Sequence, residues 1–249
     1  MAKAQTCIFL TLTAVILLAW GILFHQHWHM THAPMSQMWM PPTETGDWSI
    51  FDFSVVFVMW AIMMIAMMLP SAVPTLLAFA RICQQRKQAV YYSSLAFILG
   101  YLSIWFLFSI TLTLLQWQLH GLLWLSPMMD NNNRYLAIVI FVLAGAYQFL
   151  PLKNACLNYC QSPIGFLLNH WQNRAGGAFR MGSRHGLTCL GCCWAEMLVM
   201  FAVGVMNLTG MILVTLLIAL EKFSPLGSRR TSQAGALLFW GWATYLLIF

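Results

Sequence analysis

The sequence predicts an all-α membrane protein, a polytopic bundle of about seven transmembrane helices. Of its 249 residues, 61% are hydrophobic and only 7% are charged, whereas about a quarter of the residues of soluble domains are charged. The mean hydropathy is +0.74, and apolar stretches near the roughly 20 residues that span a bilayer recur along the chain. Since no polar segment is long enough to form a soluble domain, we expect one integral membrane domain over residues 1–249.

Short polar connections separate the expected spans. The spans are residues 7–24, 50–70, 91–115, 135–150, 187–205, 208–221 and 234–249. We interpret the first as a membrane anchor, because its apolar run is long for a secretory signal and no small-residue cleavage site follows it. The stretch 187–221 is too long for one span and short for two, and "MNLTG" offers a turn within it. Pro70 and Pro74 should kink or end the second helix.

Lysine and arginine are distributed unevenly between the predicted loops. Of the twelve cations, only Arg134 lies on one side and eleven lie on the other. The eleven fall near residues 3, 81–87, 153–184 and 222–230. Because cytoplasmic loops collect Lys and Arg, we expect a bacterial inner membrane protein with its amino terminus in the cytoplasm. The net charge of +6 is therefore a topology signal and does not indicate nucleic-acid binding. A single span over 187–221 would weaken the asymmetry, which favours two.

The seven cysteines all fall on the predicted cytoplasmic side or at the inner ends of helices. Cytosolic thiols stay reduced, so clustered ones are more often metal ligands than disulfides. Cys156 and Cys160 are spaced i, i+4, and Cys189 precedes Cys192 and Cys193 by three and four residues, so each set shares one helix face. Two such sets on one side predict a thiolate-rich metal site. The alternative is that they are small residues at helix contacts.

Methionine and one acid extend this predicted site. In "MWAIMMIAMML", Met63, Met64, Met67 and Met68 lie on two neighbouring stripes of the second helix. Such stripes usually pack a core, but together they form a row of thioethers that leads toward the cysteines. Glu196 lies within a span, where an ionisable group is costly and indicates function. We therefore include Glu196 as a metal ligand, with a protonated carboxyl in apolar surroundings as the alternative.

A second group of soft ligands begins the predicted outer loop, residues 25–49. The group is His25, His27, His29 and His32, followed by Met30, Met35, Met38 and Met40. Imidazole suits Cu(II) and thioether selects Cu(I), so this segment is predicted to capture copper. The alternative is an amphipathic belt at the membrane interface, which Trp28 and Trp39 would support.

Four segments of the chain resemble a known family. They are "WAIMMIAMMLPSAVP", "PLKNACLNYCQSP", "GCCWAEMLVMFAVGVMNLTGM" and "EKFSP", and they fall within residues 50–225. The combination resembles a bacterial family described as predicted metal-binding integral membrane proteins, a domain of unknown function with members associated with copper supply to copper oxidases. The resemblance implies metal binding by Met63, Met64, Met67, Met68, Cys156, Cys160, Cys189, Cys192, Cys193, Glu196, Met206 and Asn207.

The sequence therefore predicts a copper-handling protein surrounded by membrane lipids, with no enzyme activity. Cu(I) would be held by Cys and Met, then moved across the inner membrane or delivered to a copper oxidase or copper chaperone. Nucleotide-binding and pump motifs are lacking in the sequence. Two other classes stay open: a membrane thiol-disulfide oxidoreductase, and a structural or assembly subunit without a metal site. An oxidoreductase that makes disulfides for export needs its thiols outside, whereas these are predicted inside. The oligomeric state is not predicted.

Overall fold

A computed structural model of the chain is all-helical, as predicted. It describes residues 2–32, 34, 39–42, 45–126, 128–169, 171–172, 175–223 and 228–248, so Met35 and Met38 lie outside the described residues. The described part forms nine α-helices and one 3-10 helix: α1 (Ala2–His32), η2 (Thr45–Asp47), α2 (Ile50–Gln85), α3 (Val90–Gly121), α4 (Arg134–Tyr147), α5 (Pro151–Gln161), α6 (Pro163–Asn169), α7 (Ala175–Val203), α8 (Leu208–Phe223) and α9 (Ser228–Ile248).

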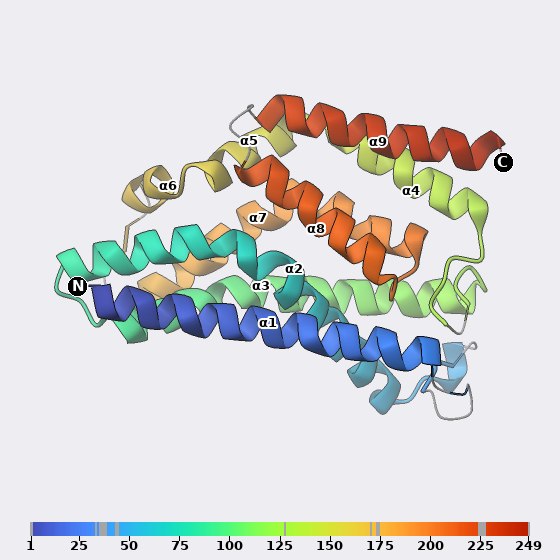
Figure 1. Cartoon of the computed structure of the whole chain (residues 1–249), viewed down its shortest axis with the longest axis horizontal. Helices are drawn as coiled ribbons and strands as arrows, with labels where there is room; N and C mark the ends of the chain where they lie inside the picture. Colours follow the sequence, from blue (N-terminus) through green and yellow to red (C-terminus); the bar gives the residue numbers. More distant parts are fainter. Residues whose placement is uncertain are drawn as a thin grey trace.

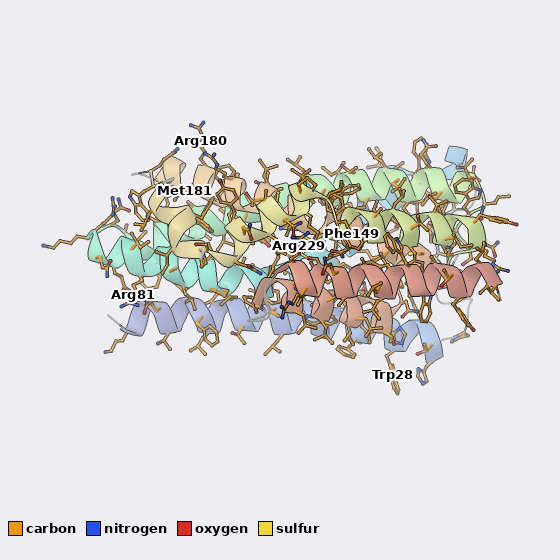
Figure 2. All side chains as sticks on the ribbon, turned by 90° about the horizontal axis from the view of Figure 1, so that it is seen from above. Trp28, Arg81, Phe149, Arg180, Met181 and Arg229 are labelled. Carbon is orange, nitrogen blue, oxygen red and sulfur yellow. The ribbon has the colours of Figure 1, made fainter. Side chains whose placement is uncertain are left out.

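The helices run along the long axis of an elongated bundle (Figure 1). α2 packs against α1 and α3, α7 packs against α3, α4 and α5, and α4 pairs with α9. The amino terminus lies at one end of the bundle, which we call the amino-terminal end, and the carboxyl terminus lies at the opposite end (Figure 1). Arg81 and Arg180 lie at the amino-terminal end and Trp28 at the opposite end (Figure 2). Arg229, in the first turn of α9, lies between the two ends (Figure 2).

Glycine allows α3 and α7 to approach closely. A Cβ on Gly100 of α3 would overlap the carbonyl group of Phe179, and a Cβ on Gly182 of α7 would overlap that of Phe97. Small residues at such contacts are typical of membrane helix pairs, where van der Waals packing takes the place of the hydrophobic effect. α7, which carries three cysteines, is therefore held directly against α3.

α2 continues through both of its prolines to Gln85, so the prolines do not end this helix and the span predicted at 50–70 is too short. Pro70 has no N–H and cannot bond the carbonyl of Ala66. The indole of Trp20 in α1 donates to that carbonyl instead, at 3.1 Å. A neighbouring helix thus satisfies the freed backbone group, as it must where water is absent, and α2 is bent rather than broken (Figure 1).

Fewer helices could cross a membrane than the seven that the sequence predicted. Among the described residues, α1, α2, α3 and α7 are long and apolar enough, and α4 with α5 would add a fifth if this pair, bent by 66°, is one span. The span expected at 208–221 is only the 16-residue α8, which is about 24 Å long at 1.5 Å per residue. The span expected at 234–249 lies in α9, whose first turns are polar. The four long apolar helices α1, α2, α3 and α7 are compatible with a membrane protein.

The predicted break within 187–221 is confirmed. α7 ends at Val203, and Gly204 has a φ of +108° that other residues rarely adopt. Asn207 then caps α8, because its side-chain oxygen accepts a hydrogen bond from the Gly210 N–H at 2.9 Å. Asn207, which the family resemblance placed among the metal-binding residues, therefore has a structural role at this turn.

Two predicted boundaries move because helices are longer than expected. α1 runs to His32, so His25, His27, His29 and His32 lie on the last two turns of a helix and not in an outer loop. α7 begins at Ala175, twelve residues before the expected start at 187, which makes Cys189 the midpoint of the helix. The cysteines of α7 thus lie halfway along it, rather than at an inner end.

Candidate metal centre

Three thiols from two helices meet at the middle of α7. Cys160 of α5 and Cys189 and Cys192 of α7 have sulfur atoms that all lie within 4.8 Å of one another. Cys189 and Cys192 are both 1% exposed. The two α7 thiols share a face because they are one turn apart, and α5 brings the third across from it. We call these three residues the thiol cluster.

The other two predicted cysteine ligands lie next to the thiol cluster. Cys193 donates to the carbonyl of Cys189 at 2.9 Å, and its sulfur lies 3.8 Å from the thioether sulfur of Met68 in α2. Cys156, one turn before Cys160, packs against Gly191, where an added Cβ would come within 2.9 Å of its sulfur. α2, α5 and α7 thus each bring sulfur to one level of the bundle.

A buried lysine contacts the thiol cluster directly. The ammonium group of Lys222 at the end of α8 donates to the sulfur of Cys189 at 2.9 Å and to the hydroxyl of Ser71 at 2.9 Å. The hydroxyl of Tyr101 in α3 lies 3.4 Å from the same sulfur. Lys222 is only 6% exposed. A buried ammonium needs a negative partner, and the thiols are the groups placed to provide it.

Glu196, which the sequence predicted as a metal ligand, faces a second buried lysine. Lys153 of α5 binds the carboxylates of Glu196 and Glu221, the latter at 2.7 Å, and also the side-chain oxygen of Gln148. Gln148 in turn donates to Glu196 at 2.8 Å. We call these four residues the ion-pair network. Glu196 therefore contacts an ammonium and an amide group, and it does not belong to the thiol cluster.

The ion-pair network sits beside a break in the helices. Gln148 caps the carboxyl end of α4, and Pro151 begins α5 after a bend of 66° between the two helices. Lys153 and Cys160 lie two turns apart on one face of α5, so the network fixes the helix that supplies the third thiol. Discontinuous helices at the level of buried polar groups are typical of binding sites in membrane proteins.

Sequence reasoning missed both lysines. Lys153 was counted as a loop cation and Lys222 as a residue at a helix end, yet they are 0% and 6% exposed. Two signals could have found them. Lys153 shares a helical face with Cys160, and Lys222 ends an apolar helix rather than a polar one. A buried acid such as Glu196 also requires a cation within reach.

The thiol cluster suits a soft cation. Metal–thiolate bonds are about 2.3 Å long for zinc, so three sulfur atoms around one ion lie about 4.0 Å apart. The sulfur atoms of the cluster lie within 4.8 Å of one another, so small rotations of the side chains would place all three on one ion. Thiolate ligands select Cu(I) or zinc over hard cations. The three described ligands leave a trigonal set, whereas structural zinc sites almost always have four.

Buried methionines lead away from the thiol cluster along α2. Met63, Met64, Met67 and Met68 are at most 1% exposed, and Met59 is 5% exposed. Met68 contacts Cys193, as described above, and Met59 lies about 13 Å further along the helix axis at 1.5 Å per residue. We call these five residues the methionine line. The line leads from the level of the thiols toward the end of the bundle where α2 begins, which is opposite the amino-terminal end.

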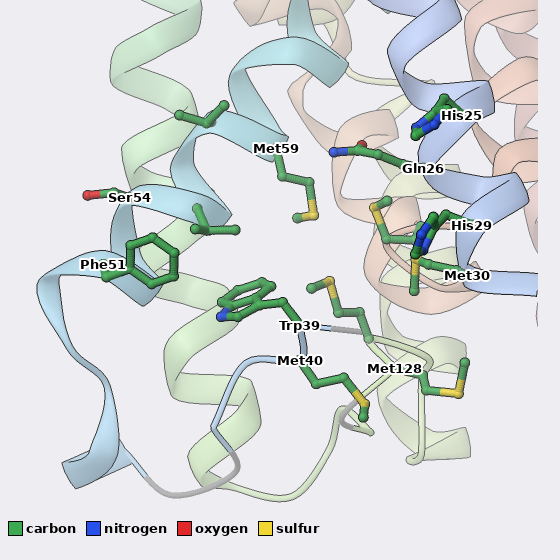
Figure 3. Close-up of a pocket in the computed structure, with 14 residues that line it drawn as sticks. His25, Gln26, His29, Met30, Trp39, Met40, Phe51, Ser54, Met59 and Met128 are labelled. Atoms are coloured by element: carbon green, nitrogen blue, oxygen red, sulfur yellow. The ribbon is translucent and has the colours of Figure 1, made fainter. Parts of the chain in front are cut away.

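Two of the four predicted histidine ligands line a cavity at that end. His25 and His29 of α1 face a cavity of about 540 Å³, and Met59 borders it from α2 (Figure 3). His27 and His32 are not among the lining residues. The ring of His32 stacks on Trp28 at 3.9 Å between centroids. The histidine segment is thus divided between a cavity and a surface.

Comparison with known proteins identifies a family. Residues 57–245 match the model of the PpoB2 family, which is described as a copper chaperone. This range contains the thiol cluster, both buried lysines and all but the first turns of α2. No curated protein and no solved structure matches the chain.

Proposed function

Because the chain belongs to the PpoB2 family of copper chaperones, we propose that it binds Cu(I) at the thiol cluster within the bacterial inner membrane and hands it on. The observation that carries the proposal is the meeting of Cys160, Cys189 and Cys192, with sulfur atoms within 4.8 Å of one another and Lys222 at 2.9 Å from one of them. In this proposal the protein is a carrier without a catalytic step.

Charge explains why a lysine belongs in such a site. Three thiolates with one Cu(I) carry a net charge of −2, and a buried charge is costly unless it is paired. The ammonium of Lys222 offsets part of this charge at 2.9 Å from Cys189. Removing a group that hydrogen-bonds to a metal ligand typically changes metal affinity about 10–100-fold.

The methionine line gives Cu(I) a route between the thiol cluster and the end of the bundle where α1 finishes. Thioethers select Cu(I) and are neutral, so an ion that leaves thiolates for methionine moves to weaker ligands and is not trapped. With the amino terminus in the cytoplasm, this route would lead to the outer side of the membrane. A copper oxidase or a copper chaperone would be the partner there.

Copper titration of the purified full-length chain tests the proposal. The assay is competition for Cu(I) with a chromophoric chelator under reducing conditions. Changing Cys160, Cys189 or Cys192 to Ser should weaken binding by at least about tenfold each, or about 1.4 kcal/mol. Cys7→Ser is the matched control, because Cys7 is an exposed cysteine outside the cluster. Equal Cu(I) affinity in the wild type and all three cluster variants would refute the thiol site.

Close thiols beside a lysine also favour a thiol-disulfide oxidoreductase as a second candidate, because cationic neighbours activate cysteine. The burial of Cys189 and Cys192 argues against it, since exchange needs access for a partner thiol. Quinone-dependent oxidation of the thiols distinguishes the two functions. An oxidoreductase would form a Cys160–Cys189 or Cys160–Cys192 disulfide that cycles with a membrane quinone. A copper carrier would not cycle in this way, and formation of that disulfide would release its metal.

A further inference from the structure

Six methionines from separate parts of the chain surround the cavity at the end of the methionine line. They are Met30, Met40, Met59, Met128, Met129 and Met206. They come from α1, the segment after it, α2, the connection between α3 and α4, and the turn between α7 and α8. Methionine usually fills irregular gaps in a core. Here Met30, Met40, Met59 and Met128 are among the residues that line a space of about 540 Å³ (Figure 3).

Exposure falls from the mouth of this cavity to its floor. His25 and His29 are exposed on α1, whereas Met59 and Met129 are each 5% exposed. One turn beyond Met59 on α2, Met63 is fully buried. An ion that entered past the imidazoles would therefore meet thioethers at increasing depth, and the last of them begins the methionine line.

The backbone holds one of these methionines in a costly conformation. Met129 has a φ of +63°, in the left-handed region that residues with a side chain rarely adopt. Its carbonyl accepts a hydrogen bond from the Val205 N–H at 3.0 Å, and its N–H donates to the Ser126 carbonyl at 2.8 Å. Strained residues that their surroundings hold in place often mark functional positions. The connection that carries Met128 and Met129 is thus fixed to the turn that carries Met206.

We propose that this cavity is a second metal site, which binds Cu(I) through thioethers and passes it to Met63. No Asp or Glu is among the described residues that line it, so it lacks the carboxylates that hold Ca²⁺ and Mg²⁺. Neutral thioethers select a soft monovalent cation and bind it less strongly than the thiol cluster. The identity of the bound ion rests on the proposed function, whereas the ligands are inferred from the residues that line the cavity.

Silver(I) binding to the full chain in detergent tests the cavity separately from the thiols, because Ag(I) is a soft monovalent cation that does not oxidise. The starting protein is a thiol-free variant in which all seven cysteines are changed to Ser, and the measurement is isothermal titration. We expect this variant to retain one Ag(I) equivalent. Adding Met40→Leu, Met59→Leu and Met128→Leu should weaken that binding at least about tenfold.

The matched control is Met181→Leu in the same starting protein, since Met181 is 2% exposed and lies at the amino-terminal end, away from the cavity (Figure 2). It should leave the retained equivalent unchanged. The three Leu changes in the wild-type cysteine background should preserve binding at the thiol cluster, which shows that the fold survives. No Ag(I) binding to the thiol-free variant, or binding that the Leu changes leave untouched, would overturn the second site. Loss of the thiol-dependent equivalent alone bears only on the thiol cluster.

Discussion

Removing the cation of the ion-pair network gives the sharpest test of what holds the site together. In Lys153→Met, the carboxylates of Glu196 and Glu221 lose the ammonium that both contact. Met has nearly the volume of the Lys stem, so packing changes little while the charge disappears. The two carboxylates would then face each other in a region where Glu196 is 1% and Glu221 is 2% exposed.

The size of the effect follows from the burial of the pair. Breaking a buried ion pair by removing one partner costs about 3–5 kcal/mol, because the remaining charge is left uncompensated. Replacing all members by neutral groups of similar shape is often nearly neutral. We therefore expect Lys153→Met to lower the free energy of unfolding by about 3–5 kcal/mol, and Lys153→Met/Glu196→Gln/Glu221→Gln to recover most of that loss.

Tryptophan fluorescence during unfolding in mixed micelles measures both quantities at constant lipid. Lys87→Met is the control, because Lys87 is exposed and surface changes usually stay within about 0.5 kcal/mol. Since the network fixes α5 and thus Cys160, Lys153→Met should also weaken Cu(I) binding, and the triple variant should restore it. A single variant no less stable than Lys87→Met, or a triple variant that recovers nothing, would refute the assignment of this network.

Three further predictions concern other parts of the bundle. Lys222→Met should weaken Cu(I) binding about 10–100-fold. X-ray absorption should show that the number of sulfur ligands is unchanged. Lys222→Arg, which keeps the positive charge, should weaken Cu(I) binding less. Gly182→Ala should lower the free energy of unfolding by about 1–3 kcal/mol in the same assay, because its Cβ would overlap a backbone carbonyl of α3. Gly176→Ala should leave that free energy unchanged, because its Cβ would meet no atom within 4 Å. If the amino terminus is in the cytoplasm, Lys87→Cys should react with an impermeant maleimide only in opened membranes. His32→Cys should react in intact cells. The reverse pattern would show that the topology is inverted.

The helical fold was predictable from composition, but the extent of each helix was not. Residues 175–186, "AGGAFRMGSRHG", contain glycines and arginines and have the composition of a loop. They are helical because Gly182 lets α7 pack against the backbone of α3, a tertiary contact that helix propensity does not include. Pro70 was expected to kink or end α2, because the sequence does not show a partner for the carbonyl that proline leaves free. Only the position of Trp20 on another helix, 46 residues away, shows how the freed carbonyl is satisfied.

The candidate site was predictable in its chemistry and not in its geometry. Helical spacing places Cys189 and Cys192 on one face, but which thiol of α5 meets them depends on how the two helices are set against each other. Lys153 sets that register by binding acids on α7 and α8. Cys160 is therefore in the thiol cluster, while Cys156, one turn earlier, packs against Gly191.

The two buried lysines differ in their partners, and the difference bears on how the thiol cluster receives an ion. Lys153 is paired with two carboxylates, whereas among the described residues no carboxylate lies within ion-pair distance of Lys222. The contacts of its ammonium are the Cys189 sulfur and the Ser71 hydroxyl, both at 2.9 Å. Because a buried ammonium is stable only beside negative charge, the same contact that stabilises Lys222 favours a thiolate at Cys189 before any metal arrives. In the proposed function, an incoming Cu(I) would therefore meet a sulfur that its contact with Lys222 already favours as a thiolate.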